Sequence, residues 1–316
     1  MYLKIGNPPQ KKIVVFDGKS LDDLQYILLN EDFAVIENRK CRIKLIYCGL
    51  SFLVNCILNY ILLFFKNKNI HTIYLYTLIK KINPRTVITS IDNCFKFADL
   101  AFLLSKKIKF IAVQNANRFD YLHNDYFLEK KIKNINLNQK YFIPNFYCFG
   151  QHEIDECKKY NINVKKFNKV GSIRVGNFFK YIETKSIKLN KVKYDICLIS
   201  EEATNINKKF KINGLEENFA KVAKLSIKYS KKYNLKFLFL QKKPNNSVQN
   251  KIEIDFYKKY LETEEFNFLI NNSNIKKSIY SSYLGLFQSK IAIGAQSTLL
   301  RDKLGCKEKV LSLNIN

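Results

Sequence analysis

The stretch IAIGAQSTLLRDKLG, residues 291–305, decides the fold of the second half of the chain. A short apolar run ends at Gly294, two hydroxyl residues follow, and a segment with helical spacing then stops at Gly305. The sequence KVLSL, residues 309–313, has the apolar character of a further strand. The pattern therefore predicts a strand, a tight loop, a helix and a second strand, which is the repeating unit of a parallel sheet.

The loop in this stretch has the features of an anion site. Gly294 lets the backbone turn and come close to a ligand. Ser297 and Thr298 lie where the helix starts, and the unpaired N–H groups of a helix start favour an anion such as a phosphate. Ser297 also suits the ordinary role of an N-cap, so the sequence leaves both roles open.

The same alternation of strands and helices extends through the whole chain. It predicts an α/β fold in which parallel sheets carry helices on both faces. The pattern restarts after Gly171, so we expect two domains, residues 1–170 and 171–316, that meet at a cleft. The predicted strands of the two domains cover residues 13–16, 33–36, 86–91, 109–113 and 141–149, and then 195–199, 236–240, 268–270, 291–293 and 309–313.

Length and charge narrow the class of protein. A chain of 316 residues suits two domains of about 150 residues each. Lys and Arg number 54 against 27 Asp and Glu, and the resulting net charge of +27 favours anionic partners. The lysines are spread along the chain and no nucleic-acid-binding signature occurs, so no nucleic-acid partner is expected.

The cysteines and the N-terminus indicate the compartment. The eight cysteines form no CxxC pair, so no zinc site is expected, and several lie in apolar runs. Free cysteines of this kind are typical of a reducing, cytoplasmic setting. The first twelve residues are polar, and no signal peptide is predicted there.

Residues 50–65 form the most apolar segment of the chain. Sixteen residues are fewer than the ~20 that a membrane-spanning helix needs, so we expect a buried helix of the first domain. The alternative is a helix that lies on the membrane surface, because basic residues flank the segment on both sides.

Polar residues follow several predicted strands, at the edge where ligands of parallel sheets bind. In the first domain these residues are Asp17, Asp92, Asn93, Gln114 and Asn115. Each of them singly also suits a turn. Asp92 has a further ordinary role as a cap of the helix expected near Phe95.

Three motifs of the first domain carry a resemblance to a known family. They are NPRTVIT at residues 83–89, IDN at 91–93 and FIAVQN at 110–115, with Arg118 nearby. Their order resembles that of bacterial surface-carbohydrate biosynthesis proteins, which are GT-B-type glycosyltransferases. The family usually has Gly where this chain has Ala116. The resemblance implies two Rossmann-like domains with a nucleotide-sugar donor bound by the second.

The resemblance also implies roles for individual residues. Asp92 and Asp17 are the candidates for the catalytic base, and Asp302 stands where many members have a Glu that holds the donor ribose. If transfer is retaining, one carboxylate could instead attack the sugar directly. Lys242 is a candidate for the donor phosphate, although it equally suits a solvated lysine. The remaining candidates are Glu201, Gly294, Ser297 and Thr298 on the donor side, and Asn93, Gln114, Asn115 and Arg118 on the acceptor side.

These observations together predict a cytoplasmic glycosyltransferase that moves a sugar from a nucleotide sugar to a surface polysaccharide or lipid-linked saccharide. The chain has no DxD motif, so neither a metal nor another cofactor is expected. We expect peripheral contact with anionic lipid at the inner face of the membrane. The alternatives are a sugar-nucleotide epimerase of the same architecture and a non-catalytic basic scaffold or nucleic-acid-binding protein.

Overall fold

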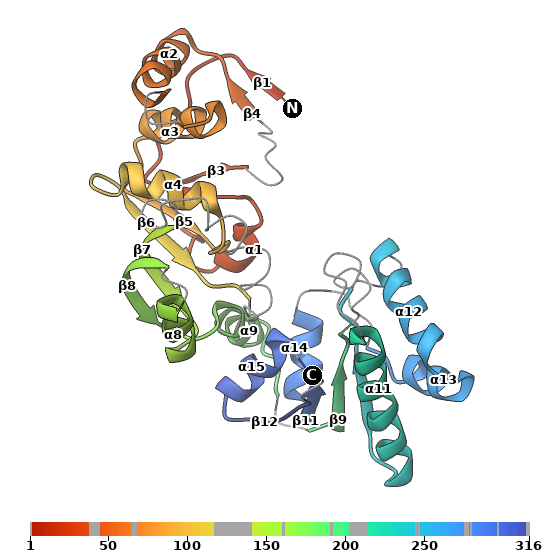
Figure 1. Cartoon of the computed structure of the whole chain (residues 1–316). Coiled ribbons are helices and arrows are strands. Elements are labelled where there is room, and N and C mark those ends of the chain that lie inside the picture. The colour runs from red at the N-terminus through yellow and green to blue at the C-terminus, as the bar shows by residue number, and fades with distance from the viewer. Residues whose placement is uncertain are drawn as a thin grey trace. The chain divides into compact units, whose positions relative to one another are not determined.

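The chain folds into two compact units, Met1–Asn177 and Phe178–Asn316, each built around a parallel sheet (Figure 1). The division falls inside helix α9 (Ile173–Thr184), a short distance after the boundary that the sequence predicted at Gly171. The computed structural model describes residues 2–37, 45–64, 68–116, 141–159, 162–189, 192–201, 214–243, 245, 247–274, 278, 280–295 and 297–313.

The first unit contains a six-stranded parallel sheet with the order β3-β2-β5-β6-β7-β8. Alternate side chains of its strands enter two different apolar clusters, so helices cover both faces. Val14 packs with side chains of α3 and α4, whereas Val15 packs with Leu24 of α1. The strands are β2 (Ile13–Phe16), β3 (Phe33–Ile36), β5 (Thr86–Thr89), β6 (Lys109–Val113), β7 (Phe142–Cys148) and β8 (Asn163–Lys169), and the helices include α1 (Ser20–Leu24), α3 (Ile70–Ile82), α4 (Phe95–Leu104) and α8 (Gln151–Lys159).

The first unit also contains a small extension, built from residues before β2 and residues after β3. Strands β1 (Tyr2–Lys4) and β4 (Leu45–Tyr47) form a separate parallel pair, and helix α2 (Leu50–Phe64) follows β4 directly. Helix α2 packs against α3, and Figure 1 shows the two helices together with β1 and β4 at one end of the unit.

The second unit contains a four-stranded parallel sheet with the order β10-β9-β11-β12. Its core forms where Phe219 and Ile227 of α11, Tyr257 of α12 and Leu269 of α13 pack on apolar strand residues such as Leu198. The strands are β9 (Tyr194–Ile199), β10 (Phe237–Leu240), β11 (Ser289–Gly294) and β12 (Lys309–Ser312), and the helices are α11 (Leu215–Lys232), α12 (Val248–Tyr260), α13 (Thr263–Asn271), α14 (Tyr280–Phe287) and α15 (Thr298–Gly305).

The structure confirms the predicted α/β class and the parallel sheets, but one predicted strand is wrong. Residues 268–270 lie in α13. That helix starts with a capping box. The side chain of Glu262 accepts the backbone N–H of Glu265, and the side chain of Glu265 accepts the backbone N–H of Glu262. Strand β8 escaped prediction because its sequence, NVKKFNK, is largely polar, as an edge strand can be.

The expectation that residues 50–65 are a buried helix is also wrong. A helix forms there, but most of its large aliphatic side chains are exposed, including Leu50, Ile57 and Leu62. The helix has apolar residues on two opposite faces, and α3 covers one of them. Apolar composition alone does not distinguish a helix that is covered on both faces from a helix that is covered on one.

A buried polar network joins α1, the end of β5 and the start of α9. Asp23 is 2% exposed, and its carboxylate accepts bonds from the Arg174 guanidinium at 2.7 Å and from the Ser90 hydroxyl at 2.8 Å. Asn177 donates its side-chain amide to the Asp23 carbonyl at 2.8 Å. The carboxylate therefore holds two elements that lie far apart in the sequence.

We expect Asp23→Ala to destabilise the first unit by about 3 kcal/mol, because it leaves a partly buried guanidinium and a buried hydroxyl without their acceptor. Urea unfolding followed by circular dichroism measures the loss. Glu183→Ala serves as the control, since the ion pair of Glu183 with Lys180 is exposed at both ends, and its midpoint should match that of the unmodified protein. Equal midpoints for both variants would contradict the role given to Asp23.

Candidate functional site

In the second unit the candidate site lies where the strand order reverses. The chain passes from β9 to β10 on one side and later returns to β11 on the other side of β9. The carboxyl ends of β9 and β11 therefore form the switch point at which open α/β sheets bind ligands. Glu201 follows β9 here, and the loop before α15 follows β11.

The carboxylate of Glu201 occupies the anion-binding position of that loop. One oxygen accepts the backbone N–H of Ala295 and the other accepts the N–H of Ser297, both at 2.7 Å. These are short, charge-assisted bonds. The loop is therefore shaped to bind an anion through its amides, and a side chain of the same unit fills that position.

The structure explains Gly294 and Ser297 at the same place. A Cβ at Gly294 would lie 3.0 Å from a Glu201 oxygen and 3.2 Å from a Leu300 methyl carbon, which is tighter than nine in ten real Cβ contacts. Ser297 is the N-cap of α15, and its hydroxyl accepts the N–H of Leu299 at 3.3 Å. Thr298 is the first residue of the helix and is half-buried.

One face of α12 holds the loops after β9 and β10. Glu253 is fully buried and accepts the backbone N–H groups of Lys242 at 2.7 Å and Lys243 at 3.0 Å. One turn later, the Tyr257 hydroxyl accepts the N–H of Glu201 at 3.2 Å and donates to the Ser200 hydroxyl at 3.3 Å. Burial raises the pKa of Tyr257, so the phenol stays protonated.

Two predicted donor residues have contrasting positions. Lys242 is exposed in the loop after β10. Asp302 is 4% exposed, and one of its carboxylate oxygens accepts the Tyr283 hydroxyl of α14 at 2.6 Å. The neighbouring Lys303 is fully buried and donates to the carbonyls of Leu286 and Ser289, both at 2.9 Å. Asp302 thus contributes to the packing of α14 on α15.

The first unit has its own switch point, between β2 and β5, and both predicted bases lie at it. Asp17 follows β2 and is 5% exposed. Its φ of 77° is in the left-handed region, and its carboxylate accepts the N–H of Lys19 at 3.0 Å. Strained non-glycine residues of this kind are found in functional turns, and an Asp in this conformation is also an ordinary turn residue.

Asp92 lies in the turn after β5 and is 8% exposed. Burial raises the pKa of Cys157 of α8 to about 12, and the nearby Asp92 charge adds to the effect. The backbone carbonyl of Asp92 accepts a hydrogen bond from the Tyr141 hydroxyl at 2.9 Å. The N-cap of α4 is Cys94 rather than Asp92, so the capping position expected from the sequence belongs to another residue.

Among the acceptor-side candidates, Gln114 has a clear structural role. It is 1% exposed, accepts the N–H of Phe149 at 3.0 Å and donates to the Ala116 carbonyl at 3.1 Å. It therefore joins the loops after β6 and β7. Asn93 and Asn115 are half-buried at the same sheet edge, and Arg118 lies outside the described residues.

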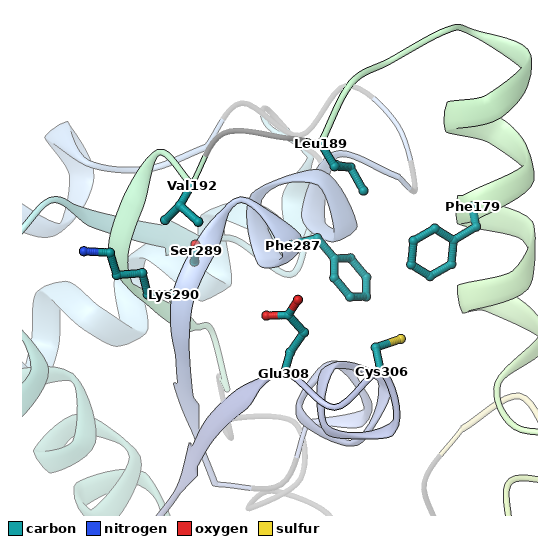
Figure 2. Close-up of a pocket in the computed structure, with 8 residues that line it drawn as sticks. All are labelled: Phe179, Leu189, Val192, Phe287, Ser289, Lys290, Cys306 and Glu308. Atoms are coloured by element: carbon teal, nitrogen blue, oxygen red, sulfur yellow. The ribbon is translucent and has the colours of Figure 1, made fainter.

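A pocket of about 320 Å³ lies elsewhere in the second unit (Figure 2). It adjoins Ser289 and Lys290, the first residues of β11, and so lies at the end of that strand opposite Gly294. Ligands of parallel sheets bind at the carboxyl ends, and this pocket is not the expected donor site. Its lining is Phe179, Leu189, Val192, Phe287, Ser289, Lys290, Cys306 and Glu308.

Comparison with solved structures identifies the architecture. UDP-GlcNAc 2-epimerase from Methanocaldococcus jannaschii is similar over 96% of this chain and 83% of its own, with 13% identity and a TM-score of 0.50. The fold is of the GT-B type, with two Rossmann-like domains. At this identity the likeness shows the fold alone.

Two further structures have lower TM-scores. Sucrose-phosphate synthase from Thermosynechococcus elongatus has 8% identity over 97% of this chain and 81% of its own, with a TM-score of 0.46. A glycosyltransferase from Rickettsia africae ESF-5 has 14% identity over 97% and 80%, with a TM-score of 0.43. No protein-family model matches the chain, and no curated protein sequence matches it significantly.

Sequence reasoning missed the residues that shape the edge of the second sheet. Glu253 and Tyr257 are four residues apart, and together with Phe256 they form the buried face of α12. A Glu on an otherwise apolar helix face is the signal that could have singled out Glu253. A carboxylate is buried only when it has hydrogen-bond partners, so such a Glu must hold nearby donors.

We expect Glu201→Ala to raise the affinity for inorganic pyrophosphate about tenfold, because it frees two amides that now hold a carboxylate. Isothermal titration calorimetry measures the change. Glu201→Gln is the matched control, because a neutral side chain of the same shape still offers one acceptor and should give a smaller gain. Unchanged affinity in a folded Ala variant would place the anion away from these amides.

Proposed function

We propose that the protein is a metal-independent glycosyltransferase of the GT-B type. In this proposal it moves a sugar from a nucleotide-sugar donor to a surface polysaccharide or a lipid-linked saccharide. The observation that carries the proposal is the pair of amides after β11, which hold the carboxylate of Glu201 at the switch point of the second sheet. A donor diphosphate carries the anionic groups that such a loop binds.

In the proposed reaction the donor phosphate takes the two amides, and Glu201 moves to contact hydroxyl groups of the donor. The start of α15 and the exposed Lys242 then stabilise the negative charge that develops on the leaving phosphate. Ser297 and Thr298 add hydroxyl groups beside it. Asp92 or Asp17 takes the proton of the acceptor hydroxyl.

A second candidate is epimerisation of a nucleotide sugar. It is supported by the likeness to UDP-GlcNAc 2-epimerase, which extends over nearly the whole chain at the level of the fold. Both reactions need the same donor site, so the loop after β11 supports them equally. They differ in whether a separate acceptor is required.

A panel of nucleotide sugars, tested with and without saccharide acceptors, separates the two candidates. Transfer predicts release of the nucleotide only when an acceptor is present, and the proposal expects this result. Conversion of the sugar without acceptor would establish epimerisation instead. Failure of every nucleotide sugar to bind, alongside salt-resistant binding of RNA or DNA, would favour the non-catalytic alternative.

We expect Asp92→Asn to lower turnover by ~10²–10⁴, with nucleotide affinity retained, because an amide of the same shape cannot accept the acceptor proton. Initial rates and equilibrium binding measure the two quantities. Asp17→Asn is the matched comparison, since Asn tolerates the left-handed backbone at position 17. If only Asp17→Asn lost turnover, the base would be Asp17.

A further inference from the structure

Helix α2 carries two apolar stripes on opposite faces. The inner stripe consists of Phe52, Cys56 and Leu63, with the polar Asn59 among them, and it faces α3. Phe52 is fully buried with its ring 5.6 Å from that of Tyr74, and Asn59 donates to the Thr77 hydroxyl at 3.1 Å. The outer stripe, defined as Leu50, Leu53, Val54, Ile57, Leu58, Ile61 and Leu62, follows the spacing i, i+3, i+4, i+7, i+8, i+11, i+12.

Solvent reaches the whole outer stripe. Its seven side chains are between 42% and 80% exposed. All seven are aliphatic, and α2 contains no charged residue at all. A continuous apolar surface of this kind marks an interaction site in a soluble domain. Single exposed aliphatic residues elsewhere need no such explanation.

The apolar surface continues beyond the start of the helix. The N–H of Gly49 donates to the carbonyl of Gly6 at 2.9 Å, so the turn after β1 lies beside the start of α2. Ile5 in that turn is 93% exposed. The ammonium of Lys81 donates to the Ser51 hydroxyl at 2.8 Å, which places a positive charge at the margin of the outer stripe. Lys4 of β1 and Lys80 of α3 are also exposed.

The sequence around this helix is basic, although the structure pairs Lys68 with Asp99 of α4 at 3.2 Å. From Asn38 to Ile91 the sequence contains nine Lys and Arg residues and no Asp or Glu. The whole chain carries a net charge of +27. An apolar stripe with basic residues beside it is complementary to a surface that has an apolar interior and anionic headgroups.

We propose that the outer stripe docks on an anionic lipid bilayer, with α2 lying flat in the interface. A helix of this length extends about 22 Å, which is shorter than the ~30 Å hydrocarbon core. None of the helices among the described residues is long and apolar enough to cross a membrane. The outer stripe therefore enters the acyl-chain boundary while the inner stripe stays on α3. This docking is independent of glycosyl transfer.

An anionic bilayer fits the surface better than a second copy of the chain. A second copy would bring a second set of lysines, Lys4, Lys80 and Lys81, towards the first, so that like charges oppose the contact. Anionic lipid supplies an apolar interior and negative headgroups together. The two occupants are separable by experiment, because self-association needs no lipid.

The first test removes the outer stripe. Leu53, Ile57 and Ile61 are changed together to Gln, which is polar and a good helix former. We expect vesicle partitioning to fall roughly 100-fold or more, because each aliphatic side chain buried in the interface contributes on the order of tenfold. Flotation with phosphatidylcholine vesicles containing phosphatidylglycerol measures it, and binding should weaken in pure phosphatidylcholine and at high salt.

The matched control makes three equivalent changes on the second unit. Leu225→Gln, Val248→Gln and Leu304→Gln also replace exposed aliphatic side chains of helices. This control should float like the unmodified protein. Unchanged thermal midpoints for both variants show that folding is intact. Equal flotation of the two triple variants would overturn the proposal, as would failure of the unmodified protein to float.

A second test adds a reporter instead of removing the surface. The chain contains no Trp, so a single introduced Trp is the only indole. The fluorescence of Leu58→Trp should shift to the blue on adding vesicles and be quenched by brominated lipids. Tyr229→Trp on α11 is exposed to a similar degree and should do neither. Equal responses at the two positions, or a lipid-free dimer that the outer-stripe variant abolishes without any flotation, would overturn the proposal.

Discussion

The carboxylate of Glu201 accepts the backbone N–H groups of Ala295 and Ser297. Both sheets depend on contacts of this kind, in which a side chain accepts N–H groups beyond a strand end. Where parallel strands end, their following backbone N–H groups leave the ladder and still need acceptors. In the second unit Glu201 and Glu253 supply those acceptors, and in the first unit Gln114 serves the loop after β7. Each of these side chains is charged or polar and is held close to the sheet edge. The edges are therefore ordered before any ligand arrives.

This requirement places structural and chemical demands on the same residues. Glu201 gives the loop before α15 its shape, and in the proposed function it also occupies the place of the donor phosphate. Asp17 turns the chain after β2, and it also presents a carboxylate at a switch point. An edge that is ordered in advance loses little entropy when a ligand binds, but the ligand must displace an internal partner.

The sequence was sufficient for the parts of the fold that depend on periodicity. Buried parallel strands have continuous apolar runs, and most of the described strands were predicted from such runs. Strand β8 has no such run, and the apolar residues of α13 are equally compatible with a strand when its capping box is overlooked. The exposure of α2 depends on which elements cover it, and that information is absent from its own composition.

The candidate site could be predicted only as a set of positions at strand ends. The sequence identified Glu201, Gly294 and Ser297 separately, because each stands next to an apolar run. It did not show that Glu201 reaches the amides after β11, since this contact joins residues that are nearly a hundred positions apart. The buried partners Glu253, Tyr257 and Asp23 escaped for the same reason. Their roles follow from tertiary contacts with backbone groups that the sequence does not specify.

Each unit has a buried thiol whose chemical reactivity depends on opening of the surrounding core. Cys157 in the first unit and Cys197 in the second are free cysteines, and burial raises the pKa of each to about 12. At neutral pH these groups carry almost no thiolate, which is the form that alkylating reagents attack. Reaction therefore waits until the surrounding core opens. The alkylation rates of these two native cysteines would time the opening of each unit within the intact chain, without any substitution.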